Sequence, residues 1–138
     1  MADSVKKVNY CYVKVPHRAG QGAEFLGELR EEGVNLLAFS GFPLKAGKSQ
    51  LDMVTNDLVG VRKVARRSGL RVSKSKKGFL VQGKDAPGAV HRHIQKLADE
   101  RINVTAADAV CAGKGRYGMI LWVKPGQYRK ASRVLRAR

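Results

Sequence analysis

Apolar and polar residues follow two different periods along the chain, and each change of period marks a predicted element. Residues 8–15 (VNYCYVKV) are rich in β-branched and aromatic side chains, which favours a strand. In residues 20–32 the apolar positions recur at helical spacing, with Phe25, Leu26 and Leu29 on one face, so a helix is predicted. The same patterns predict strands at 34–42, 50–55, 70–75, 79–82, 103–111 and 117–123, and helices at 58–68, 87–101 and 125–138.

The predicted elements occur twice in the same order, because the chain carries an internal duplication. A glycine is followed fifteen residues later by an asparagine at two places, starting at Gly20 and at Gly88, which lie 68 residues apart. An Ala-Gly-Lys triplet recurs at an offset of 66 instead, at 46–48 and 112–114. The smaller offset predicts a two-residue shift in a loop between the two blocks.

Each repeat has the order β-α-β-β-α-(β), which is the split βαβ arrangement of ferredoxin-like folds. The predicted fold class is α+β, with two tandem units at residues 5–76 and 77–138 and with the helices on one face of an antiparallel sheet. The second unit has no last strand of its own after its second helix. A sheet edge left open in this way needs cover. The N-terminal segment or a second chain could supply that cover, and we expect a homodimer.

The positive charge is concentrated in two segments of the 138-residue chain. Residues 62–77 hold eight Lys or Arg and no acid, residues 124–138 hold six and no acid, and together they carry most of the net charge of +16. Cations on one helix face repel each other unless an anion lies nearby. Candidate contacts to an anion or a nucleic acid are therefore Arg62, Lys63, Arg66, Arg67, Arg129, Lys130 and Arg133. A solvated basic face, or a docking surface for an acidic protein, is the alternative, since no aromatic residues are interleaved with these cations.

The two cysteines and the distribution of apolar residues bear on the cellular compartment. Cys11 and Cys111 lie among strand-like apolar residues, and we expect both to be small buried side chains in a reducing cytoplasm. No segment approaches the ~20 apolar residues that span a bilayer. Residues 1–7 lack the apolar stretch of a secretory signal. These features predict a cytoplasmic protein.

The turns before and after the first helix of each repeat share a motif. In the second repeat, Asp85-Ala86-Pro87-Gly88 is followed by an apolar helix and then by Ile102-Asn103-Val104. These segments resemble the Asp/Asn-x-Pro-Gly turn and the Gly/Ile-Asn pair of the ACT domain family. The first repeat carries a weaker version, with His17-Arg18-Ala19-Gly20 and Gly33-Val34-Asn35. The resemblance covers nearly the whole chain. It implies a ferredoxin-like fold and non-catalytic binding of small molecules, most often amino acids, at the interface between paired units.

That resemblance also names candidate ligand contacts, and their chemistry suits an amino acid. The candidates are Asp85, Gly88 and Asn103 in the second repeat and His17, Gly20 and Asn35 in the first. A glycine turn lets backbone approach a ligand, the helix N-terminus offers N–H groups to a carboxylate, and an aspartate can take the ammonium. An asparagine after a helix also often closes the helix in a left-handed conformation, so a capping role is the alternative for both asparagines. Because the first repeat lacks the acid and the proline, the second site should be the competent one if only one binds.

Other motifs do not support an enzyme. Residues 41–49 (GFPLKAGKS) have five residues between the glycines where a P-loop needs four, and a strand follows instead of a helix. His91 and His93 point to different sides of a helix and lack a ligand quartet, so we expect exposed or half-buried histidines and no metal. No nucleophile–base pair can be assembled from the spacing, and no cofactor is predicted.

These observations predict a stand-alone regulatory module that binds an amino acid and acts on a separate protein. A nucleic-acid-binding protein that uses the basic second helices is the rival hypothesis. A structural interaction module whose pocket has decayed is the third.

Overall fold

The computed structural model describes residues 3–138, which form two compact units. The first unit comprises residues 9–76, and the second combines residues 3–8 with residues 77–138. Strand β1 (Ser4–Pro16) contributes its first half to the second unit and its second half to the first. Residues 5–8, predicted to begin the first repeat, therefore pack with the second.

The first unit is a three-stranded antiparallel sheet with two helices. The order along the chain is β1, α1 (Gln21–Glu32), β2 (Ala38–Pro43), β3 (Lys48–Val54) and α2 (Leu58–Arg67). The sheet order is β2-β3-β1, and both pairs are antiparallel. Apolar faces of α1 and α2 join those of β1 and β3 in one core.

A regular fourth strand at 70–75 is absent from the described chain, so that part of the prediction is wrong. The segment meets β1 through a single bridge between Val13 and Val72. Beside the bridge, the amide of Tyr12 donates to the Ser73 hydroxyl at 2.9 Å, where a ladder would use a carbonyl. A serine side chain that bonds backbone in this way competes with regular pairing.

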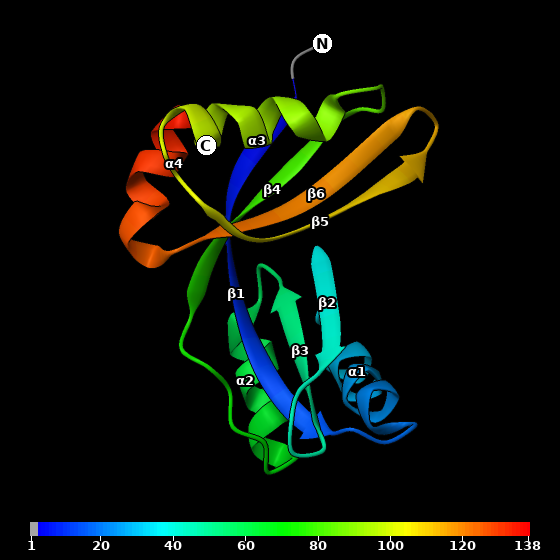
Figure 1. The fold of residues 1–138 in the computed structure, drawn as a ribbon. Helices are drawn as coiled ribbons and strands as arrows, with labels where there is room; N and C mark the ends of the chain where they lie inside the picture. The colour runs from blue at the N-terminus through cyan, green and yellow to red at the C-terminus, as the bar shows by residue number, and fades with distance from the viewer. Residues whose placement is uncertain (1–2) are drawn as a thin grey trace. The chain divides into compact units, whose positions relative to one another are not determined.

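The second unit repeats the arrangement with four strands. It contains β4 (Lys76–Lys84), α3 (Ala89–Asp99), β5 (Val104–Gly113), β6 (Arg116–Val123), a 3₁₀ turn (Pro125–Gln127) and α4 (Tyr128–Val134). The first half of β1 lies next to β4, followed by β6 and then by β5 at the edge. Figure 1 shows α3 and α4 on one face of this sheet. The predicted α+β class with ferredoxin-like repeats is confirmed.

The N-terminal segment supplies the last strand that the second repeat lacks. Val5 is buried in the same core as Phe79 and Leu121. On the other side of β1, the Lys7 amide donates to the Arg138 carbonyl at 2.9 Å, and the Arg138 amide donates to Val5 at 3.0 Å. The open edge beside β4, which motivated the expected homodimer, is therefore covered from within the chain.

The predicted helix at 125–138 is too long. It ends at Val134, and Arg136 takes a left-handed conformation with φ of 54°. Within residues 3–138, none of the helices is long and apolar enough to cross a membrane.

Strand pairing shows that the duplication has one offset through both hairpins. Phe39 pairs with Met53, and Ala107, 68 residues after Phe39, pairs with Leu121, 68 residues after Met53. The left-handed turn residues agree, because Ala46-Gly47 corresponds to Lys114-Gly115. The expected two-residue shift before the hairpins is thus wrong, and the repeated Ala-Gly-Lys triplet is a coincidence of composition.

The first helix of each repeat, α1 or α3, ends in the same left-handed turn but with a different residue. After α1, Gly33 has φ of 82°, and the next amide, of Val34, donates to Leu29 at 3.0 Å. After α3, Arg101 has φ of 58°, and the amide of Ile102 donates to Leu97 at 2.9 Å. A residue with a Cβ is disfavoured in this conformation by about 1 kcal/mol.

Replacing Arg101 by glycine should therefore stabilise the protein. We expect Arg101→Gly to raise the free energy of unfolding by about 1 kcal/mol in urea denaturation, because glycine adopts φ > 0 without strain. The reciprocal change Gly33→Ala should lower it by a similar amount. A stabilising Gly33→Ala or a destabilising Arg101→Gly would show that the left-handed turns do not set these helix ends.

Candidate ligand-binding site

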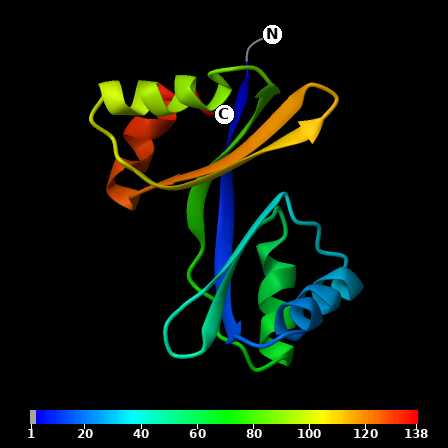
Figure 2. The ribbon, with the colours of Figure 1, turned by 45° about the vertical axis from the view of Figure 1, so that its right-hand side comes forward.

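A cavity of about 380 Å³ lies between the start of α3 and the end of β5. In both Figure 1 and Figure 2 the tip of the β5–β6 hairpin reaches the turn that leads into α3. The cavity is lined by Asp85, Ala86, Gly88, Ala89, Val90, His91, Ala109, Val110, Cys111 and Tyr117. Two of the predicted contacts, Asp85 and Gly88, thus come together in one site with mostly small apolar neighbours.

Gly88 sets the start of α3 through its backbone conformation. It is the N-cap residue with φ of 82°, and no side chain caps the helix. A Cβ at this position would meet nothing within 4 Å, so the angle and not a close contact calls for glycine. Since the first amides of a helix lack intrahelical partners, the uncapped start of α3 offers N–H donors to an anionic group in the cavity.

Asp85 joins the turn before α3 to the β5–β6 hairpin. Its amide donates to the Gly115 carbonyl at 2.8 Å, and its carboxylate accepts from the Cys111 thiol at 3.2 Å. This hydrogen bond to a carboxylate raises the pKa of the Cys111 thiol. Cys111 is exposed, so its predicted burial is wrong, whereas Cys11 is fully buried as predicted.

At the corresponding turn of the first repeat, His17 also contacts the following hairpin. Its amide donates to Gly47 at 2.8 Å, and its ring Nδ1 lies 2.7 Å from the Ser49 hydroxyl. Gly20 is the N-cap of α1 with φ of 91°, as Gly88 is for α3. His17 and Gly20 therefore share a turn, but the imidazole is engaged with the hairpin.

Equivalent positions of β2 and β5 carry different side chains. Phe39 is 43% exposed, and its ring atoms lie 3.4 Å from the place that a Cβ on Gly41 would take. With the offset of 68, the second repeat has Ala107 in place of Phe39 and the cavity-lining Ala109 in place of Gly41.

The structure does not bring the two asparagines to these turns. Asn103 follows α3 and Asn35 follows α1, each at the end of its helix opposite Gly88 or Gly20. An eleven-residue helix such as α3 is about 16 Å long, so Asn103 lies far from Asp85 within one chain. The capping role also fails, because the left-handed positions are Gly33 and Arg101 and not the asparagines.

A buried polar cluster lies beside the cavity, and sequence reasoning did not find it. The Asp3 carboxylate accepts from the Tyr117 hydroxyl at 2.5 Å, from His93 Nε2 at 2.7 Å and from Arg92 at 2.8 Å. His93 is only 4% exposed, so the expectation of an exposed or half-buried histidine is wrong for it. Its Nδ1 is buried without a hydrogen-bond partner among residues 3–138.

The cluster ties the N-terminal strand to α3 and β6. Burial alone would raise the pKa of Asp3, but the hydrogen bonds from Tyr117, His93 and Arg92 outweigh it and lower the pKa from 3.8 to about 2. Burial and the bond to Asp3 raise the pKa of Tyr117 to about 12. Gly83 on β4 makes room for the carboxylate, since a Cβ there would lie 1.9 Å from Asp3 Oδ1.

The duplication contains a signal for part of this cluster. His93 stands where the first repeat has the buried core residue Phe25, and Tyr117 stands where it has Ser49. A polar residue in place of a core phenylalanine needs a partner. Asp3 could not be found in this way, because its position depends on the N-terminal segment pairing with the second repeat.

The predicted basic contacts differ between the repeats. On α2, Lys63 and Arg67 lie 3.4 and 3.1 Å from Glu32, and Arg62 donates to the Ser73 carbonyl at 3.0 Å. The Glu32 carboxylate on α1 therefore neutralises part of the charge for which a bound anion is expected. In the second repeat, Lys130 donates to the Glu100 carbonyl at 2.9 Å. Arg129 and Arg133 line a separate cavity beside α4, and Arg66 is not among the residues that line it.

No family model matches the sequence, and no curated protein matches it either. Solved structures do match. Protein BT0572 from Bacteroides thetaiotaomicron superposes with a TM-score of 0.79 at 18% identity, over 97% of this chain and 88% of that one. The ligand-free regulatory subunit of aspartate kinase from Thermus thermophilus superposes with a TM-score of 0.68 at 13% identity, over 99% and 95%. The corresponding subunit from Thermus flavus gives 0.65 at 13% identity, over 98% and 94%.

At these identities the likeness establishes the fold. The chain has the ACT-like fold that its repeated turns resemble. The overlap includes both repeats, because nearly the whole of this chain and most of each matched chain superpose.

The Asp3 cluster should make stability depend on pH. We expect Asp3→Asn to lower the free energy of unfolding by about 1 kcal/mol at pH 7, because the variant loses a carboxylate that accepts three bonds. A lowered pKa stabilises the folded state above the unfolded value near 3.8, and that contribution disappears as the pH falls towards 2.

Urea denaturation of both proteins between pH 7 and 2.5 measures the difference. Asp99→Asn, which removes the same charge from an exposed position on α3, is the control and should change little. A wild-type advantage over Asp3→Asn that stays constant down to pH 2.5 would contradict the role given to the carboxylate.

Proposed function

We propose that the protein is a non-catalytic regulatory module that binds a free amino acid in the cavity between α3 and β5. The observation that carries this proposal is one carboxylate, Asp85, beside the uncapped start of a helix in a small, mostly apolar cavity. Helix amides suit the carboxylate of an amino acid, and Asp85 suits its ammonium. The apolar residues Ala89, Ala109 and Val110 suit a small or medium apolar side chain.

The fold supports a regulatory role. Two of the superposed structures are regulatory subunits of aspartate kinase, and both are covered along more than nine tenths of their length. Under our proposal the module contains no catalytic site and passes its ligand state to a separate protein. Both cysteines are free, which suits a reducing compartment such as the cytoplasm.

We further propose a homodimer that forms along β5. This strand is a ten-residue edge of its sheet, almost every residue of it is exposed, and Val110 is 68% exposed. A long edge strand with small apolar side chains is a template for pairing with a second copy. Pairing about a two-fold axis is antiparallel, so Asn103 of the second copy would approach the far end of β5, next to Asp85. This arrangement gives Asn103 the ligand role that its position within one chain does not.

The first-repeat candidates His17, Gly20 and Asn35 form a weaker site under the same proposal. His17 replaces the acid, and its ring Nδ1 lies 2.7 Å from the Ser49 hydroxyl. We therefore propose that the second repeat carries the functional site.

A thermal-shift screen of the twenty amino acids tests the ligand. At least one should raise the melting temperature, because a ligand at about a hundred times its Kd stabilises a protein by about 2.7 kcal/mol. Asp85→Asn should abolish that shift, since it removes the charge that faces the ammonium and keeps the shape. His17→Ala and Asn35→Ala should leave it unchanged.

A filled cavity provides a second control for the screen. Ala109→Phe places a bulky side chain at an exposed position that lines the cavity, so the variant should fold and lose the shift. A flat response of the wild type to all twenty amino acids, or an equal shift in Ala109→Phe, would rule out this site.

Sedimentation velocity tests the dimer with a matched pair of variants. Val110 on β5 and Phe42 on β2 occupy equivalent positions 68 residues apart, and both are exposed. We expect Val110→Lys to dissociate the dimer, because it places a charge on the pairing edge, and Phe42→Lys to leave it intact. A monomeric wild type, or a dimer lost only in Phe42→Lys, would contradict pairing along β5.

A further inference from the structure

A second cavity of the same unit gathers cations without any acid. It has a volume of about 420 Å³ and lies beside α4, and it shares no lining residue with the cavity at Asp85. We call it the basic cavity, after its five cationic side chains: Lys7, Lys77, Arg129, Arg133 and Arg136. These cations come from β1, from β4 and from α4 with the turn after it.

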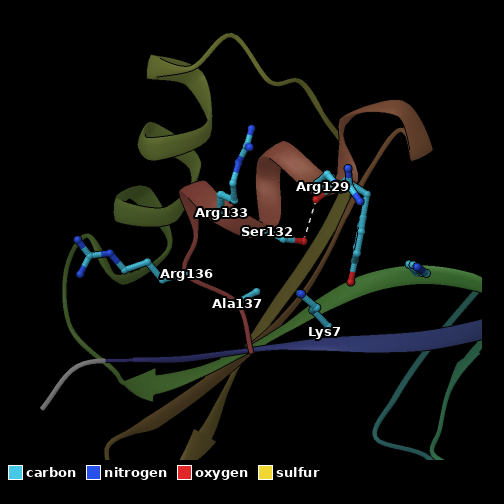
Figure 3. A pocket seen from close by; sticks show the side chains of 8 residues that line it. Lys7, Arg129, Ser132, Arg133, Arg136 and Ala137 are labelled. Carbon is cyan, nitrogen blue, oxygen red and sulfur yellow. Dashed lines mark hydrogen bonds between the residues drawn. The ribbon is translucent and has the colours of Figure 1, made fainter.

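Figure 3 shows how the labelled residues lie around the basic cavity. Lys7 on β1 faces Ala137 and Ser132, while Arg133 and Arg136 extend outward from α4 and the turn that follows it. In that view the ends of the Arg133 and Arg136 side chains point away from each other and from Lys7, so the two arginines form the outer rim of the cavity.

The cations of the basic cavity differ from those of the first repeat in lacking acidic partners. Lys63 and Arg67 on α2 both pair with Glu32. None of the five cations of the basic cavity forms an ion pair with any residue between 3 and 138. Like charges gathered in one place repel each other, and a bound anion would relieve that repulsion.

Arg136 adds an observation of a different kind. Its φ of 54° is left-handed, and the amide of Ala137 donates back to Ser132 at 2.9 Å, which is a turn where glycine is the usual residue. Arg101 takes the same conformation outside the basic cavity, so this turn does not mark a site by itself. It does allow glycine to replace Arg136 without loss of stability, which isolates the effect of the charge.

The surroundings of Tyr128 indicate which anion fits. Phe79 stacks on its ring with the centroids 4.5 Å apart, and Lys77 Nζ lies 5.7 Å from its centroid. Its hydroxyl donates to the Gly78 carbonyl at 2.9 Å. The Tyr128 ring already contacts Phe79 and Lys77, so it does not stack on a nucleobase in this arrangement. Recognition of an anion in the cavity would therefore depend on charge.

We propose that the basic cavity binds a polyphosphate chain, the chemistry shared by inorganic polyphosphate and the triphosphate of a nucleotide. Five cations that line one cavity and its rim can neutralise several phosphate charges of one chain, and arginine and lysine are the usual phosphate-binding side chains. The site is independent of the amino-acid site proposed above.

Calorimetric titration of the full chain with tripolyphosphate at low salt tests the proposal. We expect Arg133→Ala and Arg136→Gly each to weaken binding by about two- to fivefold, as for the loss of one exposed ionic contact. Arg136→Gly should also raise the melting temperature, because it relieves the left-handed arginine. Gain of stability with loss of affinity is a combination that a damaged fold would not produce.

Arg101→Gly is the matched control, since it removes the same charge from the other left-handed arginine of the unit, outside the basic cavity. It should raise stability and leave the affinity unchanged. Titration with ATP distinguishes the sources: equal affinity supports the inorganic chain, and tighter binding supports a nucleotide. Absence of tripolyphosphate binding, or equal weakening by Arg101→Gly, would overturn the proposal. A single-stranded oligonucleotide that binds more tightly than either, and depends on Arg66 as much as on Arg133, would replace it with an extended nucleic-acid surface.

Discussion

The second unit depends on a strand that comes from the opposite end of the chain. Its own repeat provides three strands and two helices, and the segment before Asn9 provides the fourth. This pairing buries Val5 in the core and delivers Asp3 to His93 and Tyr117. It also brings Lys7 to α4, where the basic cavity forms. The polar cluster thus contains Asp3, which directly precedes this strand, and the basic cavity contains Lys7 from the strand itself.

The two repeats share a backbone and differ at the positions that shape sites. Pairing partners and left-handed turns recur at a constant offset of 68 residues through the hairpins. Against that constant frame, His17 is replaced by Asp85, which lines a cavity, and Phe25 is replaced by His93, which joins a polar cluster. The second unit thus carries an acid at one cavity and cations at another.

The fold could be predicted because it depends on local patterns repeated twice. Apolar periodicity located every helix, and the glycines at 20, 33 and 88 take the left-handed conformations that their places at helix ends suggest. The position of Asp85 beside the start of α3 followed from the same turn. The predicted strand at 70–75 is wrong because a serine side chain replaces a ladder bond there, which apolar periodicity does not reveal.

Features that depend on distant segments could not be predicted from the repeat. Asp3 precedes both repeats, and nothing local indicates that it meets His93. The exposure of Cys111 follows from its place on the edge strand β5 and not from its apolar neighbours. The separation of Asn103 from Asp85 follows from the length of α3, which a motif does not convey.

Amide chemical shifts measured by NMR during titration with a mixture of the twenty amino acids test the central claim most directly. Shifts should change for residues 88–91 and 109–111, which line the cavity of the second unit. The equivalent residues 20–23 and 41–43 of the first unit should stay unchanged. Shifts of equal size at both turns, or none at either, would contradict the assignment of an amino-acid site to the second unit.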